Sequence, residues 1–170
     1  MTDKLRIQEL TPTQELSLAI KLAAEGHLDQ KDKGGNPYIL HPLKVMHYLK
    51  TDDFQLMAIG VMHDLLEDTD LIAADLVLMG FSQRVIGGTV LLTKKETQTP
   101  EEYLTGILSN YDAIRVKLCD LRHNTDVRRL KGVGHKDLLR IQKYHDMYVR
   151  LKTAKELHES LNALSVGAVS

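Results

Sequence analysis

The sequence HDLLEDT, at residues 63–69, follows the apolar run MAIGVM at residues 57–62. The apolar residues predict a buried helix over residues 53–68. On a helix of 3.6 residues per turn, four polar side chains share an arc of about 140°: His63, Asp64, Glu67 and Asp68. Burying unpaired carboxylates is very costly, whereas a divalent cation among them reverses the sign of the effect. The motif therefore predicts a metal site within a helical protein.

His41 and Asp120 extend this pattern, so that the chain reads H, then HD, then D. Imidazole nitrogens and carboxylate oxygens together suit a borderline or hard divalent cation, and four such ligands leave room for water and a phosphate oxygen. The pattern indicates metal-assisted hydrolysis of a phosphate ester or anhydride. Each residue alone has a simpler interpretation, since His41 before Pro42 could cap a helix and Asp120 could lie on an exposed face.

Asp120 begins a stripe with Asn124 and Arg128, at intervals of four residues. This spacing predicts one helix face, on which the three side chains could serve as metal ligand, substrate hydrogen-bond donor and phosphate clamp. A second HD pair, His145-Asp146, lies in a strongly charged segment. We predict that this second pair lies on the surface, because an HD dipeptide alone is weak evidence for a site.

Helix signals recur along the chain and no segment alternates with period two, so the sequence predicts an all-α fold, a single-domain multi-helix bundle. Several residues are candidates for helix N-caps: Thr11, Asp52 or Asp53, Asp70, Ser82 and Thr99. The expected helices span residues 12–25, 42–50, 53–68, 71–79, 82–92, 100–109, 112–130 and 136–160.

The chain has 170 residues, 43% of them hydrophobic, which suffices for one core. We expect one domain over residues 1–170, with the motifs in a core of about residues 11–160. The sequence shows no apolar run of about 18 residues and no signal-peptide pattern, which predicts a soluble, cytoplasmic protein without membrane contact. Its single cysteine, Cys119, lies among apolar residues and is expected to be a small buried side chain.

The net charge of −1 conceals an uneven distribution. Residues 115–155 contain 12 Lys and Arg against 4 acids, whereas residues 1–114 contain 10 against 17. The near-neutral total and the lack of aromatic residues between the basic ones argue against dedicated nucleic-acid binding. The basic segment instead favours a wall that faces a small phosphorylated ligand, the alternative being a solvated helix face.

Three strings together resemble a known family: PYILHP at residues 37–42, HDLLEDT at 63–69 and VKLCDLRHN at 116–124. They are similar to the HD phosphohydrolase superfamily, and within it to the hydrolase domain of RelA/SpoT proteins and to the stand-alone small alarmone hydrolases. The resemblance implies that Glu67 and Asp68 orient or activate the attacking water. It implies manganese as the bound ion, with another divalent ion as the alternative, and four metal ligands: His41, His63, Asp64 and Asp120.

Members of this family hydrolyse the 3′-pyrophosphate of guanosine tetra- or pentaphosphate, (p)ppGpp, and the resemblance implies the same small nucleotide as substrate. It assigns substrate contacts to Lys33, Asn124, Arg140, Lys143 and Tyr144. One departure lies in the loop before the PY pair, where the family usually carries Arg-Lys and this chain has Asp32-Lys33. Because an aspartate cannot stack on a base as a planar cation does, Asp32 could accept hydrogen bonds from the guanine edge, or the site takes another ligand.

Two alternatives stay open at this point. A hydrolase of another nucleotide, such as an NADPH phosphatase, a deoxynucleotidase or an enzyme that degrades a signalling nucleotide, would use the same ligands with a changed loop. A binding-only HD module would lose the ligands or the acidic pair, all of which are present here. The apolar residues near the carboxy terminus permit a homodimer.

Overall fold

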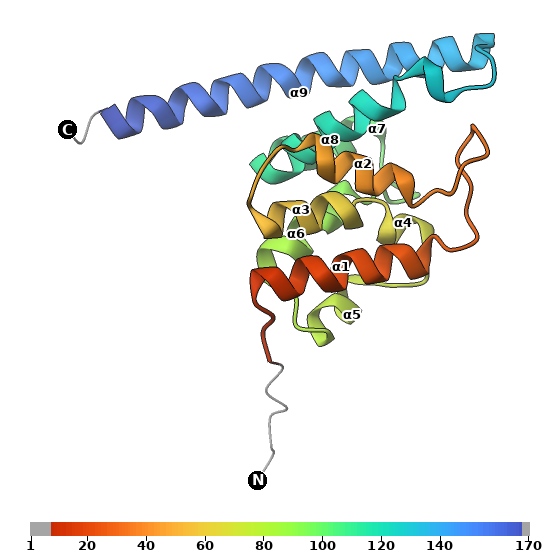
Figure 1. Cartoon of the computed structure of the whole chain (residues 1–170). Helices are drawn as coiled ribbons and strands as arrows, with labels where there is room; N and C mark the ends of the chain where they lie inside the picture. Colours follow the sequence, from red (N-terminus) through yellow and green to blue (C-terminus); the bar gives the residue numbers. More distant parts are fainter. Residues whose placement is uncertain (1–7, 168–170) are drawn as a thin grey trace.

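The computed structural model describes residues 8–167, and within this range the chain is helical, with one isolated bridge between Lys31 and Pro37. The prediction of an all-α bundle is confirmed (Figure 1). The helices are α1 (Pro12–Gly26), α2 (Leu40–Tyr48), α3 (Phe54–Met62), α4 (Leu65–Asp68), α5 (Ala73–Leu78), α6 (Gln83–Leu92), α7 (Pro100–Leu108), α8 (Tyr111–Asn124), the 3-10 turn η1 (Val127–Arg129) and α9 (His135–Gly167).

Side-chain caps explain where several helices begin. Thr11 and Thr99 each accept a backbone N–H at the start of α1 and α7 and form capping boxes, and a proline follows each of them. The side chains of Asp53 and Ser82 also accept a backbone N–H, at the starts of α3 and α6. The cap expected at Asp70 is wrong, because α5 begins only after Ile72.

Helix α3 forms the centre of the bundle, in contact with α1, α2, α6 and α8 (Figure 1). Two glycines permit this crowding. A Cβ atom on Gly60 would lie 2.9 Å from a methyl of Leu49, and a Cβ atom on Gly88 would lie 2.7 Å from the side chain of Ile59. Ile59 is fully buried, and a buried side chain of this size contributes about 1.5–3 kcal/mol through the hydrophobic effect.

The single helix expected over residues 53–68 is wrong, because α3 ends at Met62 and α4 begins at Leu65. The Nδ1 atom of His63 lies 2.9 Å from the carbonyl oxygen of Gly60, which is the acceptor that the N–H of Asp64 would use in a continuing helix. His63 and Asp64 therefore lie in a turn between two helices, and the four polar side chains do not belong to one continuous helix.

Helix α8 also ends earlier than expected, at Asn124, where residues 112–130 were predicted to be helical. Arg128 consequently leaves the face of Asp120 and Asn124. It is exposed and donates to the carboxylate of Asp126.

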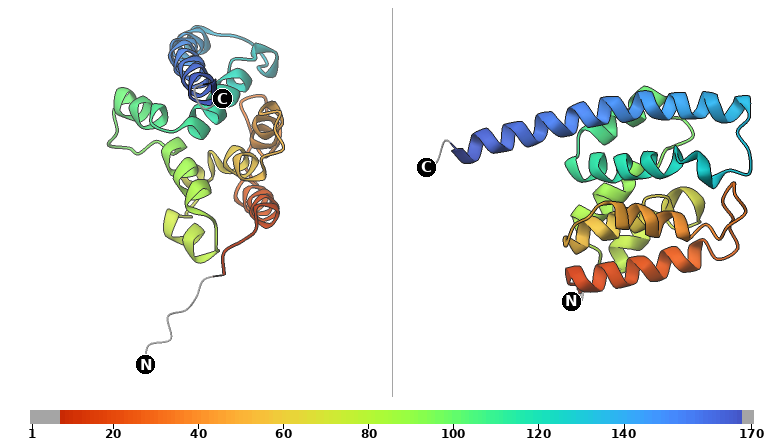
Figure 2. Two further views of the ribbon diagram at one scale, coloured as in Figure 1. Left: turned by 90° about the vertical axis from the view of Figure 1, so that its left-hand side faces the viewer. Right: turned by 45° about the horizontal axis from the view of Figure 1, so that its top comes forward.

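Helix α9 has 33 residues and lies across α7 and α8. It was expected to end at residue 160 but continues to Gly167, and its carboxy-terminal part extends beyond the rest of the bundle (Figure 2). Neither α9 nor any other helix within residues 8–167 has a stretch long and apolar enough to cross a membrane.

A buried carboxylate joins α1 to the central helices. Glu15 is fully buried, although it belongs to the first turn of α1. Its oxygens accept the backbone N–H of Ser82 at 2.6 Å and the side-chain amide of Gln55 at 2.8 Å. The carboxylate thereby replaces the water that both donors lose on folding, and it fixes the starts of α3 and α6 against α1.

We predict that Glu15→Ala lowers the free energy of unfolding by about 2–3 kcal/mol, because it removes the charged acceptor of the part-buried Ser82 N–H and one of the two acceptors of the Gln55 amide. Urea denaturation followed by circular dichroism measures this loss. Glu25→Ala is the matched control on the same helix. Glu25 is exposed, and its carboxylate lies 3.9 Å from Nζ of Lys21, which is a long and solvent-screened ion pair. Its loss should therefore change the free energy of unfolding by less than about 0.5 kcal/mol. Equal losses in the two variants would contradict the role assigned to Glu15.

Candidate metal centre

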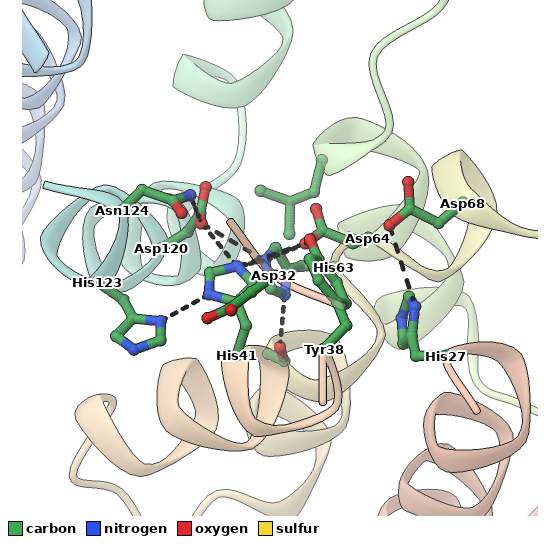
Figure 3. Close-up of polar contacts among 12 residues, drawn as sticks. His27, Asp32, Tyr38, His41, His63, Asp64, Asp68, Asp120, His123 and Asn124 are labelled. Atoms are coloured by element: carbon green, nitrogen blue, oxygen red, sulfur yellow. Dashed lines mark hydrogen bonds and ion pairs between the residues drawn. The ribbon is translucent and has the colours of Figure 1, made fainter. Parts of the chain in front are cut away.

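Two histidines from different elements face each other in the core. His41 lies in the first turn of α2, and His63 lies in the turn after α3. Their Nε2 atoms are 3.2 Å apart, and each residue is at most 2% exposed (Figure 3). The packing of α2 against α3 therefore places two buried ring nitrogens around one point.

Two carboxylates are directed to the same point. Oδ1 of Asp120, on α8, lies 3.1 Å from Nε2 of His41 and 3.6 Å from Nε2 of His63. Oδ2 of Asp64 lies 3.4 and 3.0 Å from the same two nitrogens. Ligand atoms of His41, His63 and Asp120 all lie within 4.8 Å of one another, and Asp64 lies at the edge of this cluster.

The chemistry of this cluster fits a divalent cation. Burial favours the neutral ring of His63, but the carboxylates of Asp64 and Asp120 outweigh it and raise the pKa of His63 to about 10. Positive charge is therefore strongly favoured at the position where the ring nitrogens and carboxylate oxygens converge. A mixed nitrogen and oxygen donor set of this kind suits manganese, iron or zinc.

Both rings are oriented by contacts on their outer side. Nδ1 of His63 lies against the carbonyl of Gly60, and Nδ1 of His41 lies 2.7 Å from Nδ1 of His123. Burial, Arg129 and His41 lower the pKa of His123 to about 4, so this ring is neutral and its Nδ1 can accept a hydrogen bond from Nδ1–H of His41. With Nδ1 as the donor in both rings, Nε2 of His41 and Nε2 of His63 are the atoms that would bind an ion, an arrangement that outer partners of metal ligands commonly ensure.

Asp120 is held at both oxygens. Nζ of Lys117 lies 2.8 Å from Oδ2, and the amide of Asn124 donates to Oδ1 at 2.6 Å. Burial opposes the ionisation of Asp120, but Lys117 and the histidines outweigh it and hold the pKa of this carboxyl well below its usual range. The carboxylate is therefore charged and fixed in orientation.

Tyr38 performs the same task for Asp64, since its hydroxyl donates to Oδ2 at 2.6 Å. Burial and the Asp64 charge raise the pKa of Tyr38, which keeps the hydroxyl protonated. Sequence reasoning assigned no role to Tyr38, Lys117 or His123. Lys117 and His123 were within reach of such reasoning, because each is three residues from Asp120 on a helix.

The acidic pair after the HD motif lies outside this cluster. Glu67 and Asp68 are exposed, in contrast to the buried histidines. Glu67 accepts the backbone N–H of Lys94 at 3.0 Å, and Asp68 accepts the amide of Gln30 at 2.9 Å. Both carboxylates are thus held by one hydrogen bond each and keep free lone pairs.

A cavity of about 880 Å³ opens over the cluster. It contains Asp64 and Asp120 at its base, with Glu67 and Asp68 also in its wall, whereas His41 and His63 lie behind the surface. All five residues predicted to contact substrate line it: Lys33, Asn124, Arg140, Lys143 and Tyr144. Five cations that the sequence did not assign to the site line it as well: Lys31, Lys94, Lys117, Arg129 and Arg150. The cavity therefore combines an acidic base with walls that contain both cations and acids.

Asp32 is already engaged within its loop. Oδ1 accepts the backbone N–H groups of Gly34 and Asn36 at 2.9 Å, and Oδ2 lies 3.1 Å from Arg129. Arg129 also donates to the carbonyl of His123 at 3.0 Å. Of the two arginines that follow α8, Arg129 lines the cavity and Arg128, the residue suggested by the helical spacing, does not.

The second HD pair is exposed on α9. Asp146 lies in the outer wall of the cavity, and neither His145 nor Asp146 belongs to the buried cluster that contains His63. Burial therefore distinguishes the two HD pairs.

Comparisons with known proteins agree with these observations, although no family model matches the chain. The chain is 32% identical over 120 residues to a guanosine-3′,5′-bis(diphosphate) 3′-pyrophosphohydrolase of Aquifex aeolicus, covering 66% of this chain and 17% of the relative. It is 30% identical over 133 residues to a GTP pyrophosphokinase of Streptomyces coelicolor, covering 71% of this chain and 16% of that protein. The chain thus spans about a sixth of the length of these two relatives.

A solved structure shares the fold. It is described as a metazoan ortholog of SpoT that hydrolyses ppGpp and plays a role in starvation responses. The TM-score is 0.67 at 20% sequence identity, and the match covers 86% of this chain and 94% of the other. The resemblance to RelA/SpoT-type hydrolases is confirmed by these relatives, and the helical fold is that of the SpoT ortholog.

We predict that Asp120→Asn lowers the affinity for Mn²⁺ by at least about tenfold, because it replaces a charged ligand that is already oriented by two partners. Isothermal titration of the metal-free protein with Mn²⁺ gives the affinity. Asp146→Asn is the control from the exposed HD pair and should bind as the wild type does. Similar losses in both variants would show that the wrong pair had been chosen.

Proposed function

We propose that this chain is a metal-dependent phosphohydrolase that removes the 3′-pyrophosphate from (p)ppGpp. The names of the Aquifex relative and of the SpoT ortholog support this substrate. The observation that carries the proposal is the buried cluster of two histidines and Asp120, joined by the Asp64 carboxylate, at the base of a cavity whose walls contain several cations. This arrangement suits a phosphorylated ligand whose reacting group lies next to an ion.

The ion would be held by His41, His63, Asp64 and Asp120, and manganese, the ion that the family resemblance implies, is compatible with their mixed donors. When bound, it would act as a Lewis acid on a phosphoryl oxygen and increase the acidity of a neighbouring water. The residues themselves supply orientation. The outer contacts of the ligand side chains are made within the protein before any substrate enters, which reduces the reorganisation needed during the reaction.

Glu67 and Asp68 are proposed to position the attacking water. Their carboxylates line the cavity next to Asp64, and each retains lone pairs that can accept hydrogen bonds from water. Such a water would be directed at the phosphorus while the leaving group departs on the opposite side.

Cations on the other walls would offset the charge of the phosphate groups. Lys33, Arg140 and Lys143 line the cavity from the loop after α1 and from α9. Asn124 and Tyr144 would contact the sugar. Asn124 reaches the cavity while its amide also holds Asp120, so a bound ribose and the metal ligand would share one side chain.

A hydrolase of another small nucleotide is the second candidate, and the state of Asp32 favours it. Both carboxylate oxygens of Asp32 already accept hydrogen bonds from Gly34, Asn36 and Arg129, which leaves this residue poorly placed to bind a guanine edge. A binding-only module is disfavoured, because the ligand set and the acidic pair are all present around one cavity.

A homodimer and a cytoplasmic location stay predictions. For the dimer, support comes from exposed leucines that follow one face of the projecting part of α9, namely Leu157, Leu161 and Leu164.

The choice between substrates can be tested with a panel of nucleotides incubated with the protein and Mn²⁺. We predict that ppGpp is converted to GDP and pyrophosphate. Turnover of NADPH or a deoxynucleotide with no turnover of ppGpp would instead support the second candidate. No turnover of any nucleotide by protein with bound Mn²⁺ would contradict the hydrolase.

Glu67→Gln should lower kcat on the order of 10²-fold while Mn²⁺ content and KM stay close to wild type, because a water-positioning group acts mainly in the transition state. Steady-state kinetics and elemental analysis measure these quantities. Glu156→Gln, at an exposed position on α9, is the control and should be fully active. Loss of the metal from Glu67→Gln would mean that Glu67 is a ligand.

A further inference from the structure

A third histidine is buried near the site but belongs neither to the metal cluster nor to the cavity wall. His27 follows the last turn of α1 and caps it through its backbone N–H, which donates to the carbonyl of Ala23. Its side chain is fully buried, and within residues 8–167 its Nε2 atom has no hydrogen-bond partner. A buried polar atom without a partner is unfavourable. A histidine is therefore expected at this position only if its other ring nitrogen, Nδ1, makes a polar contact that an apolar side chain could not make.

That contact leads to the acidic pair. Nδ1 of His27 lies 2.6 Å from Oε1 of Gln30, and Nε2 of Gln30 donates to Oδ2 of Asp68 at 2.9 Å. The His27 ring lies close to Asp68, with Nδ1 4.0 Å from Oδ2 (Figure 3). Three side chains from the end of α1, the following loop and α4 therefore form a continuous relay.

The direction of each hydrogen bond in this relay is fixed by chemistry. An ionised carboxylate only accepts, so Gln30 must present its NH₂ group to Asp68 and its carbonyl oxygen to His27. His27 must then donate from Nδ1. We infer that the proton lies on Nδ1 and that Nε2 is the unprotonated atom, because in the part of the chain that the structure describes Nε2 has no acceptor to which it could donate.

The same ring supports a neighbour of the metal cluster. The rings of His27 and Tyr38 are 4.9 Å apart, and the Tyr38 hydroxyl donates to Asp64. Backbone hydrogen bonds from Gln30 to His27 and from Tyr38 to Gln30 close the loop between them. His27 is thus placed where the supports of Asp64 and of Asp68 meet.

Asp68 needs such a support. It is exposed, and among the described residues the amide of Gln30 is its one hydrogen-bond donor from a side chain. A carboxylate at the end of the four-residue helix α4 would otherwise rotate freely. With Oδ2 held by Gln30, the remaining lone pairs keep a constant direction, which a water-positioning group requires.

We propose that His27 is a positioning residue that, through Gln30, fixes the orientation of the Asp68 carboxylate toward the reacting water. The inference rests on the proposed hydrolytic function. It assigns to His27 a role that depends on the donor at Nδ1 and not merely on the volume of the ring.

Two substitutions separate these roles. In His27→Asn the side-chain amide nitrogen takes the place of Nδ1, whereas in His27→Gln it takes the place of Nε2. We expect His27→Asn to retain kcat within about threefold, and His27→Gln and Gln30→Met to lower kcat by about 10–100-fold, since small misplacements of catalytic groups have effects of this size. KM and Mn²⁺ content should change by less than about twofold in all three, because no ligand or substrate contact is altered.

Circular dichroism establishes that each variant is folded at the assay temperature. His47→Gln, at an exposed histidine on α2, should leave kcat unchanged. Equal kcat in His27→Asn and His27→Gln, whether both are active or both impaired, would overturn the inference. A change confined to KM or to metal content would overturn it as well.

The tautomer of His27 provides a readout that needs no activity. Long-range ¹H–¹⁵N spectra of the wild-type protein should show His27 protonated at Nδ1 and unprotonated at Nε2. If an active protein shows the opposite tautomer, the role of His27 is overturned but the proposed function is not. A wild-type protein that hydrolyses no nucleotide contradicts the proposed function, and the role in positioning water with it, whichever tautomer is found.

Discussion

The structure depends on one electrostatic constraint, which is that two carboxylates and two imidazoles must lie together where water has little access. His41, His63 and Asp120 are nearly fully buried, and Asp64 completes the group at the base of the cavity. Such a cluster is stable only if every atom that does not face the centre has its own partner. Gly60, Tyr38, Lys117 and the other outer partners meet this requirement, and they direct the free donor atoms inward.

The fold follows from placing these partners. The turn at His63 and Asp64 ends the central helix α3. It places the side chains of these two residues close to the candidate metal ligands on α2 and α8, and both of these helices pack against α3. The loop after α1 supplies Tyr38 to one carboxylate and Gln30 to another. The bundle thus holds the candidate metal ligands, while the loop after α1 and one side of α9 contribute residues to the wall of the cavity.

Local patterns in the sequence predicted where several helices begin, because capping residues such as Thr11 and Thr99 act over three residues. They did not predict the helix break at His63, where the histidine side chain contacts a backbone carbonyl that a continuing helix would use. They also did not predict the early end of α8, as a result of which Arg129 and not Arg128 lines the cavity. Sequence reasoning also missed contacts between a candidate metal ligand and its outer partner where the two residues are distant in sequence. Tyr38 and Asp64 are 26 residues apart, and His41 and His123 are 82 apart. Helical periodicity carries no information at such separations.

The central claim is that the buried cluster is a metal site. The most direct measurement is the anomalous scattering of crystals grown with Mn²⁺ and recorded on both sides of the manganese absorption edge. We predict one strong peak within about 2.5 Å of Nε2 of His41, Nε2 of His63 and a carboxylate oxygen of Asp120, with Asp64 as the fourth ligand. A peak bound only by Glu67 and Asp68, or no peak between the two histidines at saturating Mn²⁺, would contradict the claim.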